Sequence, residues 1–288
     1  MKLHPVVQST LLGAALLSVG AGRSSAYNIL AVDMGAYWNN PYDQYFGAKE
    51  GYGARGAAGE RWFTRVHYSD LAGVNFCDYD VLLVQSTFDD DFVLQETVDA
   101  LNGLKAVKSQ IHDYVAMGGG LVAWAEPFPE GEVHKWGWTP VEVQSRGIFH
   151  ENSVEVADPL HPVMAHSTDA SLSGWHSSWH GYFEQYDSRL GAVARTGDYG
   201  VGDARTHRDL TLAGAYNQDG SGRMVFSGQD PDYHAYQGWD GAKSMIGDAL
   251  DWAQSGGVCH PVPEPGSLLL LGGGLAAAAL ALRRPRRA

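Results

Sequence analysis

The sequence predicts an α/β domain, a three-layer sandwich in which helices cover both faces of a mainly parallel sheet. Continuous apolar runs bounded by polar residues are typical of strands buried on both faces, and three of them lie at residues 27–32, 80–85 and 121–124. Between the second and third runs, apolar residues spaced by three and four over residues 91–117 predict a long amphipathic helix. A strand, a helix and a second strand in this order form a βαβ unit, whose two strands lie parallel.

The remaining elements follow from shorter patterns. Glycines at 118–120 end the long helix, because a left-handed cap favours a residue without Cβ. A turn at 217–222 that contains Asn, Asp and Gly joins two apolar runs and predicts a β-hairpin. Residues near 125–190 are rich in Gly, Trp and His and predict an irregular insertion or lid. Other predicted strands lie at 61–68, 141–148, 153–156, 191–195, 211–216 and 223–227, and a last helix is predicted at 241–253.

The amino-terminal segment, residues 1–26, predicts a signal peptide. It begins with a basic residue, continues through the apolar stretch 11–19, and ends on small residues that suit a signal peptidase. We expect cleavage after Ala26 and export across the inner membrane. The alternative is a first helix of the core, but the apolar run is short and leads directly into a strand pattern.

The carboxyl-terminal segment, residues 259–288, contains a short motif, an apolar run and a basic tail in that order. Pro263, Glu264 and Pro265 precede the apolar residues 268–282, and four arginines follow. This arrangement resembles the PEP-CTERM sorting signal. The resemblance implies that an exosortase cleaves at or near the motif and passes the protein to the cell envelope or to secreted polysaccharide.

The apolar run of this segment predicts a short transmembrane helix. Its length would be about 22 Å, less than the hydrocarbon core of about 30 Å, so the helix would be a marginal tether. The arginines would hold the tail on the cytoplasmic side and leave the body outside the inner membrane. The alternative is an ordinary membrane anchor that is never processed.

The charge of the body excludes one class of partner. Six of the 20 Lys and Arg residues and one of the 33 Asp and Glu residues lie outside residues 27–262, so this part carries a formal net charge of −18. Such a body repels nucleic acid and anionic lipid, and it contains no basic stripe with interleaved aromatic residues. We therefore expect no nucleic-acid partner.

The chain has two cysteines, and both would be exported to an oxidising compartment. Cys77 precedes a predicted strand and Cys259 follows the last predicted helix. A disulfide between them is the default expectation in that compartment, and the spacing does not suit a zinc site. The bond would tie the end of the domain to its sheet.

Four segments carry a family resemblance, at residues 79–84, 114–122, 158–163 and 222–227. In this order they make the body, residues 27–258, similar to the class I glutamine-amidotransferase-like superfamily, in particular to its ThuA-like branch of trehalose-utilisation proteins. The resemblance covers about residues 27–254 and implies a flavodoxin-like α/β fold. In amidotransferases of this superfamily, a catalytic Cys follows the strand that corresponds here to residues 121–124, and a His lies downstream.

This sequence lacks both members of that catalytic pair. Ala125, followed by Glu126, stands where the Cys would be, and Gln-Asp-Pro-Asp at residues 229–232 stands where the His would precede a Pro-acid pair. An alanine cannot form a thiolate, so glutamine hydrolysis by the family mechanism is not available. The departure favours a protein that is not an enzyme.

A parallel sheet nevertheless places its site at the carboxyl ends of its strands. Asp33, Gln85, Glu126 and Asp230 follow predicted strands and should line a single crevice. Glu126 is the candidate general acid or base, because neighbouring aromatic residues would raise its pKa by desolvation, with Asp230 or His180 as a partner. The alternative is that Glu126 is a solvated loop residue or a hydrogen-bond acceptor.

Aromatic residues predict a sugar-binding surface near this crevice. Sugar rings stack on exposed aromatic faces beside carboxylates and amides, and the alternative is that these residues pack the insertion's own core. The predicted ligand-binding residues are Asp33, Gln85, Trp124, Trp175, Trp179 and Tyr233.

Metal sites are the remaining alternative. His176 and His180 are four residues apart and would share a face of a helix, although Gly174 and the serines around them do not favour a helix. Three aspartates at 89–91 lack the spacing of a calcium loop and suit a helix N-cap equally well. The sequence therefore calls for no cofactor.

These observations leave three functional hypotheses. The first is an exported, non-catalytic protein that binds or organises extracellular polysaccharide. The second is a carbohydrate-active hydrolase or isomerase that uses Glu126. The third is a metal-dependent hydrolase centred on His176 and His180.

Overall fold

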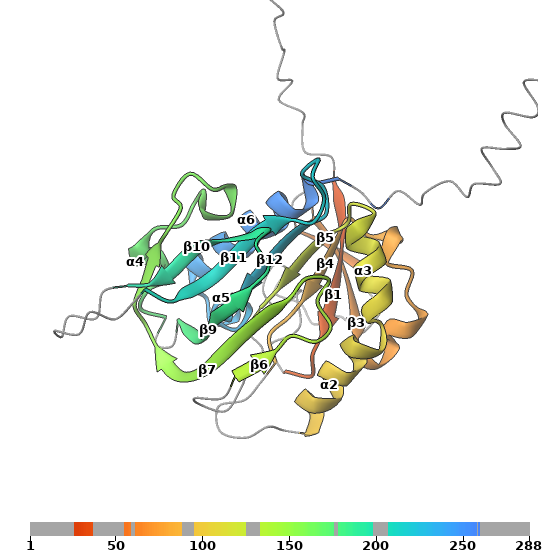
Figure 1. Ribbon diagram of the computed structural model, residues 1–288, viewed down its shortest axis with the longest axis horizontal. Coiled ribbons are helices and arrows are strands. Elements are labelled where there is room, and N and C mark those ends of the chain that lie inside the picture. The colour runs from red at the N-terminus through yellow and green to blue at the C-terminus, as the bar shows by residue number, and fades with distance from the viewer. Residues whose placement is uncertain are drawn as a thin grey trace, which may run out of the picture.

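A single mixed sheet of 12 strands forms the framework of the computed structural model (Figure 1). The structure describes residues 26–36, 55–58, 61–87, 95–124, 133–175, 178–197, 207–257 and 259. The strand order is β2-β3-β1-β4-β5-β12-β11-β9-β7-β6, and β10 pairs with β11 and β8 off this path. The strands are β1 Tyr27–Asp33, β2 Arg55–Ala58, β3 Arg61–His67, β4 Val81–Val84, β5 Gly120–Ala123, β6 Val133–Lys135, β7 Val143–Glu151, β8 Val154–Val156, β9 Trp179–Tyr186, β10 Leu190–Thr196, β11 Asp209–Ala215 and β12 Arg223–Ser227. The α-helices are α2 Gln95–Ala106, α3 Lys108–Ala116, α4 Asp169–Leu172, α5 Pro231–Tyr236 and α6 Asp240–Gln254, and the 3₁₀ helices are η1 Tyr68–Gly73, η2 Phe76–Asp78 and η3 Pro162–Met164.

The parallel part of the sheet confirms the predicted α/β layering. Strands β3, β1, β4, β5 and β12 run parallel, and β1, β4 and β5 are buried along nearly their whole length, as their continuous apolar runs predict. Helices α2 and α3 pack on one face and α6 on the other. The predicted long helix is broken at Val107, whose backbone leaves the helical region, but its apolar stripe is buried as expected.

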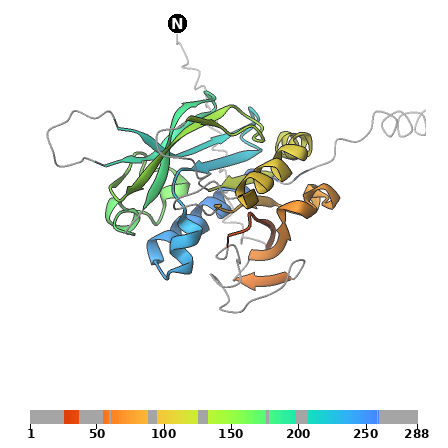
Figure 2. The same ribbon diagram turned by 90° about the horizontal axis from the view of Figure 1, so that it is seen from below.

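The rest of the sheet corrects the prediction of a mainly parallel arrangement. Every pairing outside the five central strands is antiparallel, including the predicted hairpin of β11 and β12. The segment predicted as an irregular insertion supplies β6, β7, β8 and β9 to the same sheet. Short connections favour antiparallel neighbours, whereas parallel ones need a crossover. Figure 2 shows these antiparallel strands curving away from the helix-covered part.

The tryptophans of this region pack inside the protein. Trp175 and Trp179 join the cluster beneath α6 together with Trp124, while Trp136 and Trp138 lie in the cluster on the opposite face. All five are no more than 3% exposed. Core packing, the alternative to an exposed sugar-stacking surface, therefore accounts for them in this structure.

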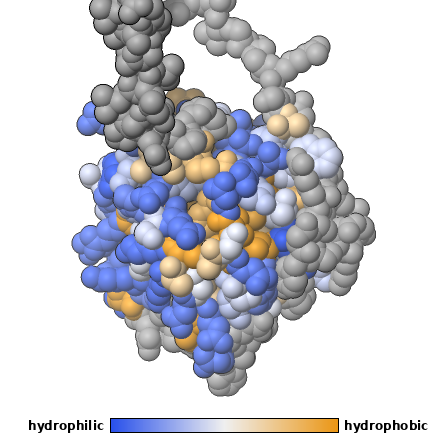
Figure 3. Space-filling model, turned by 90° about the vertical axis from the view of Figure 1, so that its right-hand side faces the viewer, coloured by the Kyte–Doolittle hydropathy of each residue, from blue (hydrophilic) through white to orange (hydrophobic). Residues whose placement is uncertain are grey.

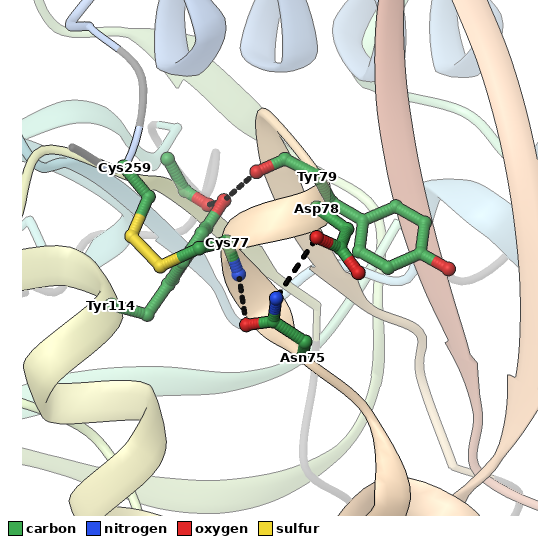
Figure 4. Close-up of a disulfide and its surroundings, with 7 residues drawn as sticks. Asn75, Cys77, Asp78, Tyr79, Tyr114 and Cys259 are labelled. Carbon is green, nitrogen blue, oxygen red and sulfur yellow. Dashed lines mark hydrogen bonds between the residues drawn. A yellow bond between two sulfur atoms is a disulfide. The ribbon is translucent and has the colours of Figure 1, made fainter. Parts of the chain in front are cut away.

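The predicted disulfide is present and joins Cys77 in η2 to Cys259 after α6, with a Cα–Cα distance of 5.1 Å (Figure 4). It lies at the amino end of β4, where Tyr114 Oη donates a hydrogen bond to the carbonyl of Tyr79. A cavity of about 220 Å³ adjoins the bond. Its lining residues are Val74, Asn75, Phe76, Cys77, Gln110, Asp113, Tyr114 and Met117.

The face of the molecule seen in Figure 3 is largely hydrophilic. Figure 3 looks at the side on which α2 and α3 lie in Figure 1, and hydrophilic side chains surround a small hydrophobic patch there. No helix in the described part of the chain has the length and apolar character needed to cross a membrane. The predicted signal peptide and the predicted helix at 268–282 lie outside the described residues.

Candidate functional site

Polar side chains follow the central strands at the carboxyl edge of the sheet. Asp33 ends β1, Gln85 follows β4, Trp124 follows β5 and Gln229 lies just beyond β12. Odd-numbered residues of β1 and β4 face the core cluster under α6, and the same alternation directs Asp33 and Gln85 to that face. Because β1, β4, β5 and β12 are neighbours in the sheet, these groups form one row, here called the polar edge.

Asp33 has a structural partner at this edge. Arg65 on β3 donates a hydrogen bond from Nη2 to Asp33 Oδ2, and the backbone N–H of Gly35 donates to Asp33 Oδ1 at 2.8 Å. The carboxylate is 1% exposed, so the guanidinium balances a buried charge. Asp33 thus closes the turn after β1.

Gln85 is the most unusual member of the polar edge. Its side chain is 1% exposed, yet neither its amide nitrogen nor its amide oxygen has a hydrogen-bond partner among the described residues. Thr87 Oγ1 and the indole Nε1 of Trp124 and of Trp179 are likewise buried with no hydrogen-bond partner in the described part of the chain. Each such group costs about 1–3 kcal/mol of stability, so their concentration here requires an explanation.

Gln229 is held in place on one side only. Thr211 on β11 donates a hydrogen bond to Gln229 Oε1 at 3.2 Å and shares a second bond of 2.9 Å with Ser227. Within the residues that the structure describes, the buried amide nitrogen of Gln229 has no hydrogen-bond partner. The amide is therefore oriented by the sheet with its donor group unused.

Helix α5 starts at this edge and is tied to β4 through Asp232. Pro231 occupies its first turn, where the missing N–H is not needed. Asp232 accepts hydrogen bonds from the backbone nitrogen and the hydroxyl of Ser86, both at 2.8 Å. Burial, together with the charge of Asp230, raises the pKa of Asp232 to about 6, although the bonds from Ser86 lower it.

A group of two histidines and a carboxylate lies at the start of the same helix. The Nε2 atoms of His180 and His234 lie 3.4 and 3.2 Å from Asp230 Oδ1. His180 is at the start of β9, where its backbone nitrogen donates to the carbonyl of Gly228 at 2.9 Å. Burial by itself raises the pKa of Asp230, but the charges and hydrogen bonds of the two histidines outweigh it and hold the pKa at about 2. We call these three residues the His-Asp-His cluster.

The structure brings together some predicted site residues and not others. Asp33, Gln85 and Trp124 lie in the polar edge, and Asp230 directly follows its member Gln229, whereas Glu126 and His176 lie outside the described residues. His180 is on a strand, so the helix that would place it on one face with His176 does not form at His180, in line with the Gly and Ser residues that disfavour it. Strand pairing of β9 with β7 and β11 excludes the helix.

The aromatic candidates have different environments. Trp175 and Trp179 are each 2% exposed, and the ring of Trp175 lies 5.1 Å from that of His234. Tyr233 is half-buried on α5, and its ring lies 5.1 Å from the same imidazole. Trp175 and Tyr233 therefore flank the imidazole of His234 in this cluster.

Sequence reasoning missed Ser86, Gln229, Asp232 and His234. A usable signal existed for one of them, because Asp230 and His234 are four residues apart on a segment that begins with Asp-Pro, a helix start. Ser86 and Gln229 gave no signal, since their importance depends on burial.

Two of the solved structures that resemble this chain are described here. A ThuA-like protein from Parabacteroides merdae ATCC 43184 shares 13% sequence identity over 83% of this chain and 94% of that chain, with a TM-score of 0.40. The N-terminal domain of mmIFT52 shares 10% identity over 69% of this chain and 87% of that chain, with a TM-score of 0.34. TM-scores below 0.5 describe a likeness of chain path that carries no argument about activity.

A family comparison identifies the carboxyl-terminal segment. No curated protein matches the chain. Residues 261–287 match the family model of the PEP-CTERM protein-sorting motif, which includes the predicted Pro263-Glu264-Pro265 signal. The motif begins two residues after Cys259, the disulfide-bonded residue that follows α6. The chain therefore carries a PEP-CTERM protein-sorting motif and is an exported protein that an exosortase sorts toward the cell envelope.

Proposed function

We propose that the exported domain is a binding protein for a hydroxyl-rich ligand, a sugar unit of extracellular polysaccharide, which it holds at the polar edge. The observation that carries the proposal is the buried amide of Gln85, whose donor and acceptor have no partner among the described residues. A protein retains such a costly group where a ligand completes its hydrogen bonds.

The chemistry of the unused groups favours sugar hydroxyls. A hydroxyl both donates and accepts hydrogen bonds, as does the side-chain amide of Gln85. The amide nitrogen of Gln229 and the indole nitrogens of Trp124 and Trp179 add donors for hydroxyl oxygens. With the tryptophan faces packed in the core, recognition depends on these polar atoms more than on ring stacking.

The position of the sorting motif supports this use of the polar edge. Cys259 is bonded to Cys77 at the amino end of β4, and the motif starts at residue 261. The polar edge lies at the opposite, carboxyl end of the same strand. While the motif is held at the membrane for sorting, this edge would face away from the bilayer and toward envelope polysaccharide.

A role in binding also agrees with the missing nucleophile. The two cysteines of the chain are joined in the disulfide, so no thiol is available for the amidotransferase type of reaction. A hydrolase that uses Glu126 is the enzymatic alternative, and the experiment below includes it.

The test measures binding of the exported domain to a glycan array and, by calorimetry, to purified envelope polysaccharide. Gln85→Met keeps the side-chain volume and removes both hydrogen-bonding atoms, and it should abolish binding. The matched control is Gln185→Met on the exposed side of β9, which should bind as the parent does. Equal binding by Gln85→Met would refute the proposal. Turnover of a glycan that Glu126→Gln abolishes would replace binding with hydrolysis.

A further inference from the structure

The His-Asp-His cluster has the spacing of metal ligands. His180, Asp230 and His234 each offer one ligand atom, and the three atoms lie within 4.8 Å of one another. A tetrahedral zinc ion with bonds of roughly 2.0–2.1 Å would separate its neighbouring ligand atoms by about 3.3–3.4 Å. The 3.4 and 3.2 Å from the imidazole Nε2 atoms to Asp230 Oδ1 therefore already match two edges of such a tetrahedron.

The three ligands come from two parts of the fold, the start of α5 and the start of β9. Asp230 is the residue before α5, and its side chain makes no capping hydrogen bond to that helix. His234 is one helical turn further on and shares its face. His180 is fixed from across the sheet by the bond from its backbone nitrogen to the carbonyl of Gly228.

The three side chains of the cluster differ in their exposure to solvent. The side chains of His234 and Asp230 are 2% and 9% exposed, whereas that of His180 is 20% exposed. An ion would reach the site from the His180 side, where a fourth coordination position could hold water. Zinc sites with three protein ligands keep one position open in this way.

A second His-Asp contact in the same protein shows what a simple ion pair looks like. His166 Nδ1 lies 2.7 Å from Asp248 Oδ1, but the His166 side chain is 75% exposed, and no second imidazole of the described residues shares the carboxylate. Within the residues that the structure describes, the His-Asp-His cluster is the one group of three or more potential ligands. Two imidazoles that converge on one buried carboxylate oxygen are better explained by a shared cation.

We propose that His180, Asp230 and His234 bind one divalent transition-metal ion, of which Zn²⁺ is the best match to two nitrogen ligands and one oxygen ligand. The site does not depend on the proposed polysaccharide binding, because it uses none of the unpartnered amides. A water molecule would complete the coordination.

The test uses the whole chain, expressed with export, purified without chelator and without a histidine tag. After removal of metal, Zn²⁺ is titrated by calorimetry, and Co²⁺ serves as a spectroscopic reporter of tetrahedral coordination. We expect one equivalent of Zn²⁺ per chain, and a loss of affinity of more than about 100-fold in His180→Gln and in Asp230→Asn. His166→Gln, which alters the simple ion pair, should bind as the parent does.

Folding defects are separated from ligand loss by two further measurements. Circular dichroism checks each variant, and X-ray absorption on the zinc-loaded parent should show two imidazoles and no sulfur in the first shell. An absence of stoichiometric Zn²⁺ binding by the parent, or a spectrum without imidazole scattering, overturns the proposal. Equal loss of Zn²⁺ affinity in His166→Gln overturns it as well.

Discussion

The two ends of the parallel strands differ in how fully their polar groups are hydrogen-bonded within the protein. At the amino ends, polar groups find partners within the fold: the partly buried Asn28 N donates to Asp80 Oδ2 at 2.7 Å, and the buried Tyr114 Oη donates to the carbonyl of Gly120 at 3.2 Å. At the carboxyl ends, the amide of Gln85 and the indole nitrogen of Trp124 are buried without partners among the described residues. The polar groups named at the amino ends are hydrogen-bonded within the protein, whereas those at the carboxyl ends retain the capacity to bind a ligand.

This contrast shows how one fold divides stability and recognition. The disulfide at the amino end ties α6 to the sheet directly before the sorting motif, so this end carries the sorting motif. The polar edge does not hold the sorting motif in place, and it can retain buried polar groups that do not contribute to the stability of the fold. Proteins tolerate unmet polar groups chiefly where function uses them.

Loss of the disulfide should give the largest effect. The double variant Cys77→Ser/Cys259→Ser opens a loop whose ends are 182 residues apart in the sequence, which should lower the free energy of unfolding by about 3–5 kcal/mol. Urea unfolding measures the loss, and a reducing agent should lower the midpoint of the parent but not of the variant. Two free thiols in the exported protein would contradict the assignment.

Two glycine substitutions, one at each end of the parallel strands, should have different effects on Zn²⁺ binding. A Cβ on Gly228 would lie 2.0 Å from the carbonyl oxygen of Gly181, and one on Gly120 would lie 2.8 Å from that of Ala253. Each substitution to Ala should destabilise the protein by about 1–3 kcal/mol in thermal unfolding. Only Gly228→Ala should also weaken Zn²⁺ binding, because it displaces the start of β9 and with it His180. Equal Zn²⁺ affinity in the two variants would show that the position of β9 at Gly228 does not affect Zn²⁺ binding by His180.

Gln85→Met should change stability in the opposite direction. The amide of Gln85 loses its hydration on folding and gains no hydrogen bond from the described residues. Methionine avoids this cost, so the free energy of unfolding should rise by about 1 kcal/mol. Gln185→Met, on the exposed side of β9, should leave it nearly unchanged. A loss of stability in Gln85→Met would mean that the amide has a structural role.

The smallest expected effect concerns His166. The hydrogen bond to Asp248, with the charges of Asp248 and Asp251, raises the pKa of His166 above its ordinary 6.5. Its stabilising contribution is therefore fully present below pH 6.5 and disappears as the pH rises through the folded-state value. The difference in melting temperature between the parent and His166→Gln should be larger at pH 5.5 than at pH 8.5. A constant difference would show that the imidazolium plays no part.

Local patterns in the chain were sufficient for several features. The apolar runs at β1, β4 and β5 and the stripe over α2 and α3 predicted the layered half of the fold, because burial on both faces leaves a continuous apolar sequence. The hairpin of β11 and β12 was predicted by its turn residues. The sorting motif and the disulfide followed from short signals and the oxidising compartment.

Tertiary structure alone decided the mixed sheet and the composition of the site. Asp230 and His234 are neighbours on α5, but His180 is 50 residues before Asp230 and reaches it only because the start of β9 bonds to the end of β12. Likewise, a glutamine after a strand is unremarkable until the fold buries it without a partner, as happens to Gln85. Strand order and burial arise from contacts between distant residues, which local periodicity does not encode.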